Sequence, residues 1–136
     1  MSRHLALMVD DDDLNNFICK KLFQITYPEV ELMTFNEAEA AMAHLKMLNA
    51  IDQWPDLIFL DMNMPHVNGW EFLERFSNLQ SEHKEKSKIF MLSASVTEDS
   101  IERSDEHPLI TGCISKPLQK EDLDKIMEIY INEDCV

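Results

Sequence analysis

The sequence predicts an α/β fold, a three-layer α/β/α sandwich built on a five-stranded parallel sheet. Short apolar runs alternate along the chain with longer segments of helical period, the pattern of repeated strand–helix units. Runs such as Leu57–Leu60 are apolar at every position, as expected of a strand covered by helices on both faces. The chain has only 2 glycines and 5 scattered prolines, and no stretch has the composition of a flexible linker. We therefore expect one domain over residues 1–136, with no second domain.

Each expected strand is a short apolar run that ends at polar residues. In chain order these runs are Leu5–Val9, Val30–Thr34, Leu57–Leu60, Ile89–Leu92 and Gly112–Ser115. Right-handed crossovers between parallel strands place the helices on both faces of the sheet. The ligand site of such a sheet is expected outside the carboxyl ends of its strands.

The helices are expected in the segments between the strands and after the last one, each with an apolar stripe toward the core. The stripe of the first helix is expected to be Leu14, Phe17, Ile18, Leu22 and Ile25. That of the second is expected to be Ala38, Ala41, Met42, Leu45 and Leu48. The third, after Asn68-Gly69, is expected to bury Phe72, Leu73, Phe76 and Leu79. A fourth helix is expected within Thr97–Asp105, and a fifth from Gln119 that buries Leu123, Ile126, Met127 and Tyr130.

Composition and charge argue against several classes of partner. The 12 Lys and Arg residues against 26 Asp and Glu give a net charge of −14, which disfavours nucleic acid. The apolar run Leu5–Val9 is too short for a signal peptide or a membrane span and leads into four aspartates. The 3 cysteines show no Cys-x-x-Cys spacing, so neither a disulfide framework nor a zinc site is indicated. We expect a cytoplasmic protein with no membrane or nucleic-acid partner.

Polar residues follow four of the expected strands at the end where a parallel sheet places its site. Aspartates 10–13 follow the first strand, Asp61 the third, Ser93 the fourth and Lys116 the fifth. Carboxylates brought close together repel one another, so a cation is expected among them. Oxygen ligands without His or Cys suit Mg²⁺, which keeps some of its waters and pairs with phosphate groups. The pattern predicts phosphoryl transfer with Asp61 as nucleophile, while Lys116 and Ser93 contact phosphoryl oxygens.

The chain resembles the receiver domain of the response regulators of two-component signalling. The matching motifs are Met8-Val9-Asp10-Asp11-Asp12, Asp61-Met62-Asn63-Met64-Pro65, Asn68-Gly69-Trp70, Leu92-Ser93-Ala94 and Lys116-Pro117, and together they cover essentially the whole chain. The resemblance implies a flavodoxin-like strand order, 2-1-3-4-5. It also implies that the chain is a phospho-accepting signalling domain and not a conventional enzyme. Such a domain would accept its phosphoryl group from a histidine kinase or a phosphotransfer protein.

The resemblance further implies the role of each site residue. Asp11 and Asp61 would bind Mg²⁺ directly, Asp10 mainly through water, and the backbone carbonyl of Asn63 would complete the protein ligands. Asp12 and Asp13 match no metal position of the family and are expected to cap the first helix. As in stand-alone receivers such as the chemotaxis regulator, the output would be binding to a downstream protein, which the sequence does not identify.

One departure and two alternatives accompany this interpretation. Receivers usually carry Tyr or Phe three positions before the lysine, where this chain has Cys113, so the coupling of phosphorylation to output is expected to differ. The segment Leu7–Leu14 also resembles the nucleophile motif of haloacid-dehalogenase-like phosphatases, in which Asp10 would be the nucleophile. The phosphatase hypothesis does not explain why Asp61 stands at the end of a buried strand. A receiver that only binds a partner, without phosphorylation, is the second alternative.

Overall fold

The computed structural model describes residues 4–62, 69–79, 86–93 and 108–131. They form an α/β sandwich whose five strands are all parallel. The strand order is β2-β1-β3-β4-β5, which is the predicted order. The strands are β1 (His4–Val9), β2 (Val30–Phe35), β3 (Leu57–Asp61), β4 (Lys88–Ser93) and β5 (Ile110–Ser115).

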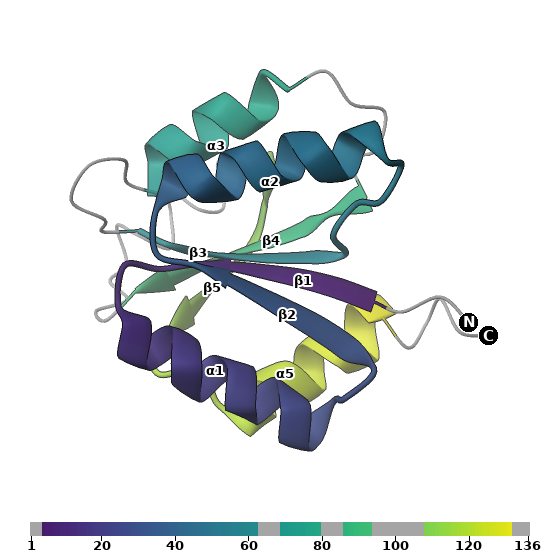
Figure 1. Cartoon of the computed structure of the whole chain (residues 1–136). Helices are drawn as coiled ribbons and strands as arrows, with labels where there is room; N and C mark the ends of the chain where they lie inside the picture. The colour runs from purple at the N-terminus through teal and green to yellow at the C-terminus, as the bar shows by residue number, and fades with distance from the viewer. Residues whose placement is uncertain (1–3, 63–68, 80–85, 94–107, 132–136) are drawn as a thin grey trace.

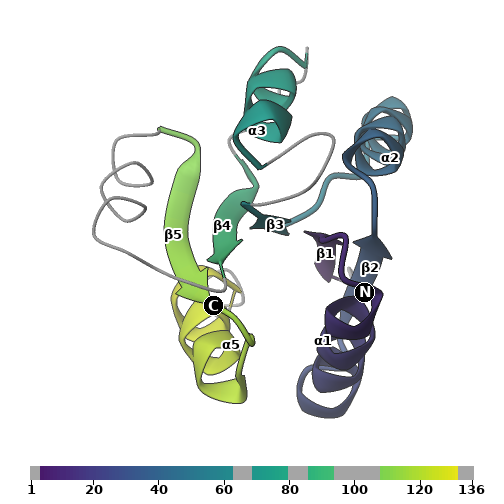
Figure 2. The same cartoon turned by 90° about the vertical axis from the view of Figure 1, so that its left-hand side faces the viewer.

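Helices cover both faces of the sheet, as Figures 1 and 2 show. Helices α2 (Ala38–Ala50) and α3 (Gly69–Ser77) lie on one face. Helices α1 (Asp13–Thr26) and α5 (Lys120–Ile126), the latter continued by a π-helical turn at Met127–Ile131, lie on the other. The fourth predicted helix, within Thr97–Asp105, falls outside the described residues. No helix among the described ranges is long and apolar enough to cross a bilayer.

Two apolar clusters fill the layers on either side of the sheet. One joins the sheet to α2 and α3, and the other joins it to α1 and α5. β3 lies at the centre and is buried along its whole length, in agreement with its unbroken apolar run. The predicted core stripes of α2 and α3 are confirmed, although Leu79 lies just beyond α3 and is partly buried. In the last helical segment Leu123, Ile126 and Met127 are buried and Tyr130 packs against them.

The predicted core face of α1 is wrong. Leu14, Phe17, Ile18 and Ile25 are 66%, 59%, 49% and 82% exposed, and Leu22 is half-buried. The residues that α1 buries are Asn16, Cys19 and Phe23.

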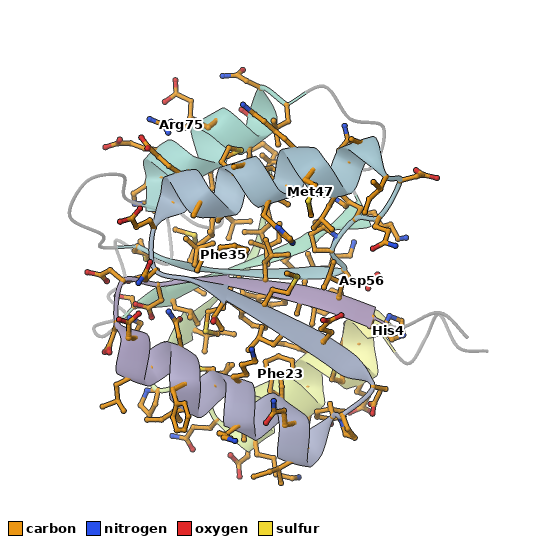
Figure 3. All side chains as sticks on the ribbon, viewed as in Figure 1. His4, Phe23, Phe35, Met47, Asp56 and Arg75 are labelled. Carbon is orange, nitrogen blue, oxygen red and sulfur yellow. The ribbon has the colours of Figure 1, made fainter. Side chains whose placement is uncertain are left out.

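The rotation of α1 follows from contacts on its opposite side. Asn16 Nδ2 donates to the carbonyl of Asp10 at 2.8 Å, and the Phe23 ring meets Phe59 of β3 edge-on at 6.0 Å between centroids. Figure 3 shows Phe23 between α1 and the sheet. Because only residues 10–12 separate β1 from α1, these contacts turn the helix so that its other apolar side faces solvent. We call Leu14, Phe17, Ile18 and Ile25 the α1 apolar stripe.

Candidate functional site

The carboxyl ends of the strands lie on the side of the molecule that faces the viewer in Figure 2. The opposite end of the sheet carries a separate polar contact, His4 Nδ1 to Asp56 Oδ2 at 3.3 Å, visible in Figure 3. At the carboxyl end, Asp10 follows β1 directly, Asp61 is the last residue of β3 and Ser93 is the last residue of β4. These three polar side chains are buried. The buried carboxylates of Asp10 and Asp61 therefore need polar partners within the protein or a cation.

Asp10 is held by several groups at once. Its backbone N–H donates to the Phe35 carbonyl at 2.9 Å, which ties the end of β1 to the end of β2. The N–H of Asp12 donates to its Oδ1 at 2.9 Å. Its Oδ2 accepts from Asn15 Nδ2 at 2.7 Å and from Lys116 Nζ at 2.7 Å.

Lys116 joins the two buried carboxylates. Its backbone N–H donates to the Ser93 carbonyl at 2.8 Å, which fixes the residue after β5 beside the end of β4. From there its Nζ lies 2.7 Å from Asp10 Oδ2 and 3.4 Å from Asp61 Oδ2. Burial alone would lower the pKa of Lys116. The negative charges of Asp10 and Asp61, and the hydrogen bonds that Lys116 donates to them, outweigh burial and raise this pKa. Lys116 is therefore a cation at neutral pH.

The structure brings three of the predicted carboxylates together. Asp10, Asp11 and Asp61 each offer an oxygen, and these oxygens lie within 4.8 Å of one another. Asp11 is exposed, so the cluster opens to solvent on its side. The donors are all carboxylate oxygens, at a spacing that a hard divalent ion accepts. The single positive charge of Lys116 does not balance the three negative charges of these carboxylates. The donor set fits Mg²⁺.

Gly69 allows α3 to start against the end of β3. A Cβ at this position would lie 2.7 Å from the Asp61 carbonyl oxygen and 2.7 Å from Met91 Cε, closer than atoms can pack. The Gly69 N–H donates to the carbonyl of Met62 at 3.4 Å. The absence of a side chain at Gly69 thus sets how closely α3 approaches the backbone of Asp61.

The remaining predicted residues have mixed outcomes. Asp12 is the N-cap of α1 and accepts from the N–H groups of Leu14 and Asn15, as expected of a capping aspartate. Asn63 falls outside the described residues. Cys113 is half-buried on β5 and lines a cavity of about 440 Å³ together with Lys116. Asn15 was not predicted as a site residue. The sequence marks it only as one of two adjacent amide residues, Asn15 and Asn16, in the helix that follows the acidic run.

Comparisons with known proteins agree with this geometry. Residues 6–128 match the response regulator receiver domain. A two-component response regulator from Cytophaga hutchinsonii aligns with a TM-score of 0.88 and 29% identity, covering 97% of this chain and 99% of that one. A response regulator receiver protein from Dyadobacter fermentans DSM 18053 aligns with a TM-score of 0.83 and 30% identity, covering 93% and 97%.

A curated relative of different overall function shares part of the chain. The protein-glutamate methylesterase/protein-glutamine glutaminase 1 of Dechloromonas aromatica (strain RCB) is 33% identical over 76 residues. That match covers 55% of this chain but only 20% of the relative. The similarity therefore concerns a small part of that protein. From the strand order, the cluster at the carboxyl ends and the match over residues 6–128, the chain belongs to the response regulator receiver domain family of two-component systems.

Proposed function

We propose that this receiver domain accepts a phosphoryl group on Asp61 from a phosphohistidine of a histidine kinase or a phosphotransfer protein. The observation that carries the proposal is the position of Lys116 Nζ between Asp10 and Asp61, beside the three clustered carboxylates. An Asp61 oxygen attacks phosphorus and the bond from phosphorus to the histidine nitrogen breaks, its electron pair staying on that nitrogen. The ring carries a proton on its other nitrogen and therefore leaves as neutral imidazole. The product is an aspartyl phosphate.

The residues of the cluster have distinct roles in this proposal. Asp11, Asp61 and the backbone carbonyl of Asn63 would hold Mg²⁺ directly, with Asp10 acting mainly through water. When bound, the ion supplies positive charge to the phosphoryl oxygens. Lys116 supplies a second positive charge, and the Ser93 hydroxyl donates a hydrogen bond to a phosphoryl oxygen. Burial of Asp61 limits the access of water to the reacting atoms.

The α1 apolar stripe supports a helical phosphodonor. It begins at Leu14, two residues after the cap Asp12, and runs about 16 Å along the helix to Ile25. The stripe begins three residues after Asp11, so a protein that presents a histidine to Asp61 is proposed to cover the start of α1 as well. A helix with an apolar face fits a stripe of this shape. We propose that the phosphodonor docks there.

The output of the domain is proposed to be binding to a downstream protein. Cys113 occupies the position of the usual aromatic residue and borders a cavity next to Lys116. A thiol is much smaller than a Tyr or Phe ring, so the rearrangement after phosphorylation is proposed to be smaller or to use other residues. A pull-down with the beryllofluoride-bound protein, compared with the untreated protein, identifies the partner. Equal capture in both states would contradict a phosphorylation-dependent output.

Labelling with acetyl phosphate and Mg²⁺ tests the acceptor. Mass spectrometry of the labelled protein should place the acyl phosphate on Asp61, and Asp61→Asn should remove it. Lys116→Met should slow labelling about 100-fold, the usual loss when one group that stabilises transition-state charge is removed. Asp13→Asn is the matched control, since Asp13 is an exposed aspartate that accepts from Asn36 instead of facing the cluster.

The alternatives predict other outcomes of the same experiment. A label on Asp10 that persists in Asp61→Asn would support the haloacid-dehalogenase-like phosphatase, which the family match does not favour. No Mg²⁺-dependent label, even from a competent kinase, would support a receiver that acts only by binding.

Transfer from a protein donor tests the docking surface separately. Phe17→Ala combined with Ile25→Ala should slow phosphoryl transfer from a phosphorylated histidine phosphotransfer protein. Labelling by acetyl phosphate should stay unchanged, because the small donor does not contact α1. The matched control changes an exposed apolar residue elsewhere, Met47→Ala on α2. Equal transfer rates in the wild type and the double variant would rule out the stripe as the docking site.

A further inference from the structure

A sulfur atom and a ring nitrogen meet where the outer strand β2 packs against α2. Side chains alternate between the two faces of β2: Leu32 packs into the apolar cluster under α1 and α5, and Phe35 packs into the one under α2 and α3. Met33 stands two residues before Phe35 and therefore points to the α2 face. There its Sδ lies 3.2 Å from Nε2 of His44 on α2. Neither residue belongs to the carboxylate cluster.

The His44 ring is held by an aromatic neighbour. The ring centroids of Phe35 and His44 lie 5.2 Å apart, with an angle of 43° between the ring planes. Met33 and His44 are both half-buried, and Met33 also lines a cavity of about 440 Å³ along β2. The pair of donor atoms is therefore fixed by packing on one side and partly open to solvent on the other.

A second thioether stands one turn further along α2. Met47 follows His44 by three residues, and side chains at this spacing are neighbours on a helix surface. Its side chain has three rotatable bonds and is 49% exposed, so it can turn toward His44 without disturbing the core. Figure 3 shows Met47 and Phe35 on the side of the sheet that α2 covers. Two sulfur atoms and one nitrogen can thus converge on one point.

This set of donors selects a soft metal ion. Thioether sulfur binds Cu⁺, and imidazole nitrogen also suits copper. Mg²⁺ and Ca²⁺ prefer oxygen, which none of the three side chains offers. The neutral His44 ring can carry its proton on Nδ1, which leaves the lone pair of Nε2 for the metal. An ion shared with Met33 requires the two donor atoms to move slightly apart, and the flexible thioether allows this.

We propose that Met33, His44 and Met47 form a binding site for Cu⁺. Glu31 supports the site, because it is exposed on the same face of β2, two residues before Met33, and adds a negative charge that favours a cation. The site is separate from the phosphoacceptor cluster and does not depend on the proposed function.

Titration of the whole chain with Cu⁺ under anaerobic conditions tests the site. Thiolates also bind Cu⁺, so every protein compared carries Cys113→Ser and Cys135→Ser, while Cys19 is 1% exposed and is kept. Carbon-13 NMR of the methionine methyl groups reports directly on the sulfur ligands. The methyl signals of Met33 and Met47 should shift and saturate at one equivalent of Cu⁺.

Substitutions of the three ligands measure what each contributes. Met33→Leu, His44→Gln and Met47→Leu should each raise the Kd for Cu⁺ at least about tenfold, the low end of the loss when even a residue behind a metal ligand is removed. Met42→Leu is the matched control, a methionine of the same helix that is buried in the apolar core, and it should keep the Kd of the parent protein. Exchanging Met for Leu conserves volume, and circular dichroism checks that each variant is folded.

Three results would overturn the proposal. If Cu⁺ shifts neither the Met33 nor the Met47 methyl signal, the contact of His44 with Met33 is only a hydrogen bond from the ring to sulfur. Equal Kd values for Met33→Leu and Met42→Leu would lead to the same conclusion. A Kd unchanged in Met47→Leu would remove the third ligand and with it the site as proposed. Labelling by acetyl phosphate should be the same in Met33→Leu and the wild type, so the copper site and the phosphorylation can fail independently.

Discussion

Helices α1 and α3 are attached to the same sheet in different ways. α3 buries Phe72, Leu73 and Phe76 along its length, so apolar packing holds it. α1 exposes its apolar stripe and buries only Cys19 and Phe23 among its apolar side chains. It is also held near its ends by polar contacts, Asn15 and Asn16 with Asp10 at one end and Tyr27 with Asp124 at the other. The difference teaches that a helix which starts beside a polar site can take its rotation from hydrogen bonds together with a few apolar contacts. Its apolar residues are then left for a partner.

The largest effect on the free energy of unfolding is expected when a Phe→Ala substitution on α3 is compared with one on α1. Phe76→Ala should lower the free energy of unfolding by about 3–5 kcal/mol, because Phe76 is fully buried against Trp54. Phe17→Ala should lower it by less than about 0.5 kcal/mol, because Phe17 is 59% exposed. Urea unfolding followed by circular dichroism measures both. Similar losses for the two variants would mean that the α1 apolar stripe is packed within the protein instead of exposed.

A smaller effect is expected at the helix caps. Asp12→Ala should cost about 1 kcal/mol, because Asp12 accepts from two backbone N–H groups at the start of α1. The matched control is Glu37→Ala at the N-cap of α2, where the side chain makes no capping hydrogen bond. That control should change the free energy of unfolding by only a few tenths of a kcal/mol. Urea unfolding without divalent ions compares them, and an equal cost would contradict polar anchoring of α1.

The smallest effect is expected at the other end of α1 and depends on pH. The Tyr27 hydroxyl donates to Asp124 Oδ1 at 2.5 Å, and this hydrogen bond is the main reason that the pKa of Tyr27 is raised to about 12 from 10.0. The folded state therefore favours the neutral phenol. The stabilisation is fully present below pH 10.0 and is lost as the pH rises to about 12.

Thermal melts of the wild type and Tyr27→Phe across this pH range measure the effect. The difference in Tm should be largest below pH 10.0 and should shrink toward pH 12. In Asp124→Asn, ultraviolet absorbance should show tyrosinate forming at lower pH than in the wild type. A Tm difference that does not change with pH would show that the hydrogen bond adds nothing to the attachment of α1.

Most of the fold could be predicted because the apolar runs mark the strands. Predicted and observed strands agree to within two residues, although Asp61 and Ser93 end their strands instead of following them. The site could be predicted because parallel strands bring their carboxyl ends together, which places Asp10, Asp61 and Lys116 in contact.

Two features of α1 could not be predicted. Helical period identifies an apolar stripe but not the side of the helix that faces the sheet, so Phe17 and Ile25 were assigned to the core. The contact of Asn15 with Asp10 depends on that rotation and was missed for the same reason. Both errors arise from contacts that residue periodicity does not contain, the hydrogen bonds between the end of β1 and the first turns of α1 and the packing of Phe23 on Phe59.

The α1 apolar stripe also affects how the protein behaves in concentrated solution. Exposed Leu, Ile and Phe side chains on one helix would draw two molecules together. Each molecule carries a net charge of −14, and the mutual repulsion opposes that approach at neutral pH. Molar salt shortens the range of this repulsion from about 10 Å to about 3 Å, and acid removes the charge. The acidic composition thus opposes self-association through the α1 apolar stripe and keeps this surface accessible to a partner.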